Sequence, residues 1–125
     1  MTRHLLMVDL KDDPSVIETY KEHHRRVWPE VLSSLKRAGI ADMEIFILGR
    51  RLVMVVDTNG HDVNACFAAH VASDPRIAEW EGLMKSMQEP PPGGGPDEWW
   101  ALMQPVFRLD GSGSAGAQSE PARRA

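Results

Sequence analysis

Tyr20 and His24 are the residues whose types and spacing point most directly to chemistry. They lie four positions apart, so on a helix both side chains reach the same point. An imidazole has an ordinary pKa of about 6.5, which suits general acid–base catalysis near neutral pH. A neighbouring phenol can position a hydroxyl group of a substrate. The same pair could equally be a buried histidine and tyrosine of the core, and the pattern alone leaves both interpretations open.

The apolar residues around this pair recur with the period of a helix and predict one buried face. Tyr20 and His24 fall on that face, whereas the adjacent His23 is rotated by about 100° toward the charged side. Of the two histidines, His24 is therefore predicted to point inward. The apolar residues that define the face are Ile17, Val27, Val31 and Leu35.

Pro29 interrupts this helical pattern. Proline lacks a backbone donor and crowds the preceding turn, so we expect a kink or break near Trp28. The bend could follow a curved sheet, or it could place Trp28 against the pocket that holds Tyr20 and His24. An aspartate before Pro14 predicts the start of the helix, and Gly39 predicts its end.

The remaining elements complete an alternation of strands and helices. A second helical region contains Val63, Phe67 and Val71 in phase, and Asp74-Pro75 restarts it. Strands are predicted over residues 3–9, 43–48, 52–57 and 103–109, with a hairpin turn at residues 49–51. The order strand, helix, strand, strand, helix, strand predicts an α+β, ferredoxin-like split βαβ fold. Its helices cover one face of a four-stranded antiparallel sheet, and either a second copy or a ligand must cover the other face.

Three tryptophans lie beside a proline- and glycine-rich loop that spans residues 89–96. Trp80, Trp99 and Trp100 could form a platform on which the C–H face of a sugar stacks, or they could seal a subunit interface. Glu81 and Glu98, next to two of them, could accept hydrogen bonds from substrate hydroxyls or could simply be solvated helix residues.

The composition is that of one globular domain, which we assign to residues 1–110. Of the 125 residues, 42% are hydrophobic and 26% are charged, and the net charge is −4, which argues against a nucleic-acid or anionic membrane surface. Residues 111–125 have nothing to bury and are predicted to be disordered. We expect a cytoplasmic protein, because Cys66 is the single cysteine and no stretch resembles a signal peptide or membrane span.

Metal and thiol chemistry are not favoured. The histidines available as ligands lack metal-binding spacing, so no metal site is predicted. Cys66 lies in an apolar helical stretch and is expected to belong to the core. The histidines considered are His23, His24, His61 and His70.

Residues 20–31, YKEHHRRVWPEV, closely resemble the L-rhamnose mutarotase family. That family carries the helix pattern Y-x-x-x-H-x-x-x-W-P-E-[LV], followed by an L-K-x-x-G turn that corresponds to residues 35–39. The similarity continues through residues 43–48, 71–75, 80, 98–103 and 106–109.

The resemblance implies a homodimeric α/β barrel that interconverts the α and β anomers of a 6-deoxy-L-hexose, L-rhamnose or L-fucose, without a cofactor. His24 would be the general acid/base and Tyr20 a sugar-binding residue. Trp80 and Glu81 match a substrate-contacting pair that is often two tryptophans, and Met43 stands where some members have a tyrosine that contacts the sugar. Residues 98–100 look more like relatives associated with L-fucose.

Other substrate-binding candidates come from the residue types. The sugar's methyl group would need an apolar pocket, for which Met43, Phe46 and Trp28 are candidates, and Trp99 could stack on the ring. Two alternative functions are a cofactor-free monooxygenase of the dimeric-barrel type and a non-catalytic ligand-binding or assembly module.

Overall fold

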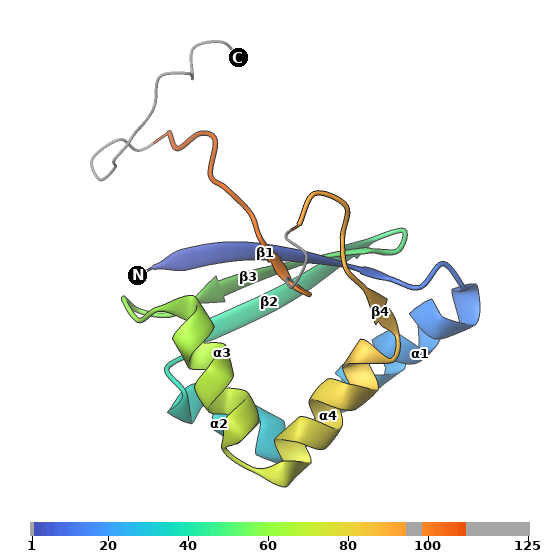
Figure 1. Cartoon of the computed structure of the whole chain (residues 1–125), viewed down its shortest axis with the longest axis horizontal. Coiled ribbons are helices and arrows are strands. Elements are labelled where there is room, and N and C mark those ends of the chain that lie inside the picture. The colour runs from blue at the N-terminus through green and yellow to red at the C-terminus, as the bar shows by residue number, and fades with distance from the viewer. Residues whose placement is uncertain (1, 95–98, 110–125) are drawn as a thin grey trace.

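The computed structural model describes residues 2–94 and 99–109. All four helices lie on one face of an antiparallel sheet (Figure 1), which is the predicted α+β, ferredoxin-like arrangement. The helices are α1 (Pro14–Arg25), α2 (Pro29–Arg37), α3 (Val63–Ala72) and α4 (Pro75–Lys85). The strands are β1 (Arg3–Leu10), β2 (Asp42–Leu48), β3 (Arg51–Asp57), β4 (Gln88–Glu89) and β5 (Ala101–Leu102). Glu98 and the predicted disordered tail, residues 111–125, lie outside the described residues.

β1 is the central strand of the sheet. The strand order is β2-β3-β1-β4, and β5 pairs with β1 on the same side as β4. Side chains alternate across the sheet, so Leu6, Val8 and Leu10 of β1 face the helices. β2 and β3 form the predicted hairpin around Gly49-Arg50, and Gly49 has the positive φ of 62° that a tight hairpin turn requires.

The break predicted at Pro29 is confirmed. α1 ends at Arg25, and Trp28, held in an extended conformation by the following proline, is the N-cap of α2. Asp13 caps α1 by accepting a hydrogen bond from the Ser15 N–H at 2.9 Å, and Asp74 caps α4 in the same way from Arg76 at 2.8 Å. α1 and α2 are therefore separate helices, and the last turn of α1 is free to lie over the sheet.

Two sequence predictions need correction. Residues 103–109 are not a strand; the fourth strand of the motif consists of two short pieces, β4 and β5, on either side of the proline- and glycine-rich segment. The buried face of α3 is Val63, Cys66 and His70, whereas Val71 is exposed. The prediction counted apolar residues and so overlooked a histidine, whose ring can be buried when its nitrogen finds a partner.

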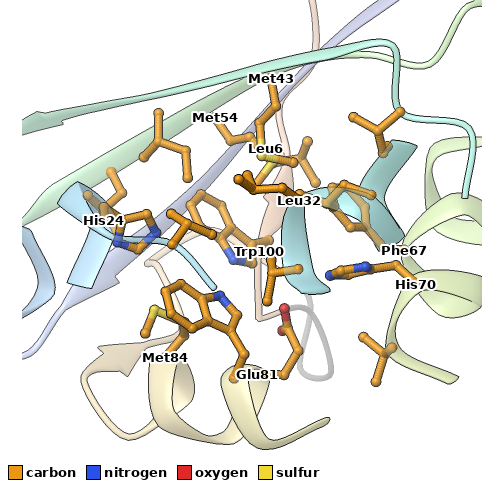
Figure 2. Close-up of a pocket in the computed structure, with 18 of the residues that line it drawn as sticks. Leu6, His24, Leu32, Met43, Met54, Phe67, His70, Glu81, Met84 and Trp100 are labelled. Carbon is orange, nitrogen blue, oxygen red and sulfur yellow. The ribbon is translucent and has the colours of Figure 1, made fainter. Parts of the chain in front are cut away.

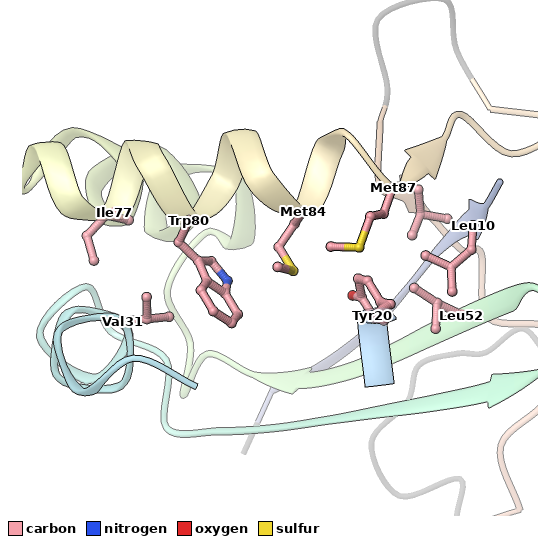
Figure 3. Packing of buried hydrophobic residues seen from close by; sticks show 9 residues of the cluster. Leu10, Tyr20, Val31, Leu52, Ile77, Trp80, Met84 and Met87 are labelled. Carbon is pink, nitrogen blue, oxygen red and sulfur yellow. The ribbon is translucent and has the colours of Figure 1, made fainter. Parts of the chain in front are cut away.

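The main core lies where α4 crosses the sheet (Figure 3). Ile77, Trp80 and Met84 project from one side of α4 toward α2 and the strands. Tyr20 of α1 packs at the other end of the cluster, beside Leu10 and Leu52. The aromatic candidates of the site, Tyr20 and Trp80, thus belong to the core that fixes their position.

Candidate functional site

A cavity of about 810 Å³ lies between the helices and the sheet. Its volume is within the range of roughly 300–1,000 Å³ that small-molecule sites occupy. Side chains enter it from α1, α2, α3, α4 and the strands (Figure 2). Of the predicted site residues, those that line it are Tyr20, His24, Met43, Trp80, Glu81 and Trp99. Phe46 and Trp100 also line it, and Trp28 does not.

His24 presents one unbonded nitrogen to this cavity. Its Nδ1 lies 3.0 Å from the backbone oxygen of Tyr20, and since a carbonyl can only accept, Nδ1 carries the proton. Nε2 is then an acceptor, and none of the hydrogen bonds among the described residues uses it. Burial lowers the pKa of His24, and the neighbouring His23 adds to this effect. The ring is therefore a neutral base at neutral pH.

Tyr20 lies directly beside this imidazole. The two ring centroids are 4.3 Å apart, as the spacing of four residues predicts. Burial raises the pKa of Tyr20 far above its usual value, and the charge of Glu81 contributes. The phenol therefore keeps its proton, and the pair combines a base with a hydrogen-bond donor.

A chain of hydrogen bonds orients the Tyr20 hydroxyl. The Trp99 indole N–H donates to Gln88 Oε1 at 2.8 Å, which leaves Gln88 Nε2 to donate to the Tyr20 oxygen at 3.5 Å. The Tyr20 proton is thereby free for a bound molecule. Gln88 is held by β4, which Arg50 anchors through Glu89 at 3.0 Å. Sequence reasoning missed Gln88, because a strand of two residues has no periodicity to detect.

Trp80 forms an apolar wall next to His24. Their ring centroids are 5.7 Å apart in an edge-to-face arrangement. Trp28 packs against Trp80 with ring centroids 5.1 Å apart, and the Arg76 guanidinium lies 3.8 Å above the Trp28 ring. Trp28 thus contacts Trp80 and does not itself line the cavity.

Glu81 and Met43 enter the cavity from opposite layers (Figure 2). Met43 comes from β2 and Glu81 from α4. Burial raises the pKa of the Glu81 carboxyl, with an opposing effect from Lys85. No hydrogen bond or ion pair among the described residues engages Glu81, so its oxygens are available to a ligand.

His70 is the second cavity residue that sequence reasoning did not place in the site. It was considered only as a possible metal ligand, yet its ring projects from α3 into the cavity (Figure 2). Its spacing of four from Cys66 could have identified it as part of the buried face of α3. Among the described residues, no three side chains of histidine, cysteine, aspartate or glutamate gather as a metal site. No helix in this part of the chain is long and apolar enough to cross a membrane.

Comparison with known proteins identifies the family. Residues 3–109 match the sequence profile of L-rhamnose mutarotase. An L-fucose mutarotase of Xanthomonas campestris pv. campestris is 46% identical over 112 residues, which cover 87% of this chain and 89% of that protein. A UPF0734 protein of Dictyostelium discoideum is 36% identical and covers 82% and 86%. An L-rhamnose mutarotase of Leptothrix cholodnii is 26% identical and covers 87% and 83%.

Solved structures share the fold. A crystal structure of an L-rhamnose mutarotase from Formosa agariphila superposes with a TM-score of 0.61 at 21% identity, covering 88% of this chain and all of that one. A dimeric ferredoxin-like protein from an uncultured marine organism gives a TM-score of 0.50 at 16% identity, covering 70% and 85%. Since the family profile spans nearly the whole described chain and two of these relatives are mutarotases, this chain belongs to the L-rhamnose mutarotase family and is an isomerase that acts on sugars.

Proposed function

We propose that this protein interconverts the α and β anomers of a 6-deoxy-L-hexose, with L-fucose as the first candidate and L-rhamnose as the second. The observation that carries the proposal is the unbonded Nε2 of His24, which belongs to a ring beside the Tyr20 phenol in the cavity lining. The higher identity to the L-fucose mutarotase than to the L-rhamnose mutarotase supports this order of substrates.

The reaction needs one proton removed from the anomeric hydroxyl and one delivered to the ring oxygen. His24 Nε2 accepts the first proton while the bond from C1 to the ring oxygen breaks. The Tyr20 hydroxyl donates its proton to the ring oxygen and recovers one from the His24 imidazolium. Rotation about the C1–C2 bond and reclosure in the reverse sequence give the other anomer. The protons balance within the pair, so no cofactor or redox step takes part.

The other cavity residues would hold the sugar. Trp80 and Trp99 offer indole faces to the C–H groups of the ring, and Glu81 offers acceptors to its hydroxyls. Met43 supplies apolar surface for the methyl group. Trp28 would not contact the sugar; it packs against the Trp80 ring and holds that ring in place.

Two-dimensional NMR exchange spectroscopy on L-fucose and L-rhamnose tests this function. The wild-type protein should accelerate exchange between the anomers of at least one sugar. His24→Ala should lose about 10²–10⁴-fold of that acceleration, the usual contribution of acid–base catalysis. His61→Ala is the control, since His61 is an exposed histidine that does not line the cavity. Absence of acceleration with both sugars, or equal rates for His24→Ala and wild type, would contradict the proposal.

We also propose that the protein is a cytoplasmic homodimer. The sheet face opposite the helices carries Leu5, Met7, Val53 and Val55, of which Leu5 is exposed. A row of apolar side chains on a solvent-facing sheet is typical of a subunit interface. A second copy laid on this face would close the two sheets into a barrel. Cys66 is buried and free of a disulfide, which suits a reducing compartment.

A further inference from the structure

His70 is almost completely buried, yet it borders the cavity. Its side chain is only 2% exposed, and its ring extends from α3 into the same space that His24 enters from α1 (Figure 2). The two imidazoles approach from opposite sides of the cavity, with Trp100 and Glu81 between them in this view. His70 has no part in the proton transfer proposed for His24 and Tyr20.

Three hydrogen bonds fix the protonation of the His70 ring. The Ser73 hydroxyl donates to the His70 backbone oxygen at 2.8 Å. Ser34 lies 2.9 Å from the Ser73 hydroxyl and 2.8 Å from His70 Nδ1. Ser34 Oγ also lies 3.4 Å from the His70 backbone oxygen, which is a longer contact. Each hydroxyl has one proton, so the three contacts of 2.8–2.9 Å are satisfied together only if Ser34 donates to Ser73 and Nδ1–H donates to Ser34. Nε2 is then left without a proton.

The lone pair of Nε2 has no partner within the described residues. None of their hydrogen bonds reaches this nitrogen, although a buried polar atom ordinarily finds a partner. Burial lowers the pKa of His70, which keeps the ring neutral and the lone pair available near neutral pH. A buried acceptor aimed into a cavity is satisfied when a bound molecule supplies a donor.

We infer that His70 Nε2 accepts a hydrogen bond from the 4-hydroxyl of the bound sugar. This inference rests on the proposed function, which places the anomeric carbon at His24. In a pyranose ring C4 lies directly across from C1, so a sugar whose anomeric carbon lies at His24 directs its 4-hydroxyl away from that residue, past Trp100 and toward the side from which His70 enters (Figure 2). His70 is thus a substrate-binding residue, and Ser34 and Ser73 position it.

The hydrogen bond to His70 affects which of the two sugars the protein prefers. L-fucose and L-rhamnose differ in configuration at C2 and C4, and the 4-hydroxyl is axial in the first and equatorial in the second. An acceptor fixed by two serines on neighbouring helices cannot follow both orientations equally. His70 therefore contributes to specificity at a position remote from the bond that breaks.

The test compares wild type with His70→Leu, each with L-fucose and with 4-deoxy-L-fucose, in which the 4-hydroxyl is replaced by hydrogen. Dissociation constants for L-fucose and 4-deoxy-L-fucose are measured by titration calorimetry, and exchange rates by NMR, for wild type and His70→Leu. We expect His70→Leu to weaken L-fucose binding about tenfold, the effect of one lost hydrogen bond, and to leave 4-deoxy-L-fucose binding nearly unchanged. His70→Gln, which restores an acceptor, should recover part of the difference.

Each contrary outcome has a distinct meaning. If His70→Leu weakens binding of both sugars equally, the residue is structural and the inference is overturned; thermal unfolding of each variant shows whether the fold persists. If the wild type binds L-fucose without accelerating exchange, the proposed function fails while the binding comparison still decides the role of His70. If the wild type binds neither sugar, both proposals are wrong.

Discussion

Lowering the pH from 7.5 to 5.5 should destabilise this protein through its two buried imidazoles. Burial lowers the pKa of His70 and of His24 in the folded state. Below about pH 6.5 the unfolded chain therefore takes up protons that the folded chain does not. A base with a lowered folded-state pKa contributes its full stability above its unfolded pKa and loses that contribution as the pH falls.

The size of the effect follows from the burial of His70. His70 is only 2% exposed, so the folded state disfavours protonation of its ring. The upper limit of the resulting decrease in the free energy of unfolding, for a folded ring that takes up no proton at pH 5.5, is RT ln(1 + 10), about 1.4 kcal/mol. For a domain of this size that limit corresponds to a decrease in Tm of roughly 5–10 °C. Glu81 has the opposite effect on the free energy of unfolding. Its pKa is raised in the folded state, so the folded chain takes up this proton more readily than the unfolded chain, and acidification stabilises the fold.

Urea denaturation at pH 7.5 and at pH 5.5 measures the contribution of His70 to the loss of stability. His70→Leu removes the titrating group, so its loss of stability on acidification should be smaller than that of the wild type, by up to about 1.4 kcal/mol. Phe67→Leu is the matched control, because it changes the same helix and cavity without removing a proton-binding group. Its loss on acidification should equal that of the wild type. Equal losses for His70→Leu and wild type would refute the reasoning that the fold excludes the charged ring.

Three further predictions concern catalysis, packing and assembly. The exchange rate should stay constant from pH 8 to below 6.5, because burial lowers the pKa of His24; an NMR pH series with its midpoint at or above 6.5 would contradict that role. Leu10→Ala should cost about 2–5 kcal/mol in chemical denaturation, since Leu10 is fully buried. Leu5→Glu should convert the proposed dimer to a folded monomer in sedimentation velocity, and an unchanged mass would place the interface elsewhere.

The helices that carry the site could be predicted because helix caps and prolines act on residues close to them in the sequence. The aspartates before Pro14 and Pro75 start α1 and α4, and Pro29 separates α1 from α2, because capping and the missing proline donor act within one turn. The helical period placed Tyr20 on the buried face together with His24. Those features depend on residues a few positions apart, and they were predicted correctly.

The sequence by itself therefore predicted the helices and the first three strands, and it placed Tyr20 and His24, the pair at the centre of the candidate site, on one helix face. Only the tertiary structure decided what completes that site. Gln88 meets Tyr20 across 68 positions of chain, and Ser34 meets His70 across 36. Such contacts follow from the register of a two-residue strand and from helix packing, which leave no periodic pattern in the sequence. The unbonded nitrogen of His70 exists because Ser34 and Ser73 use its other one, and only their spatial proximity reveals it.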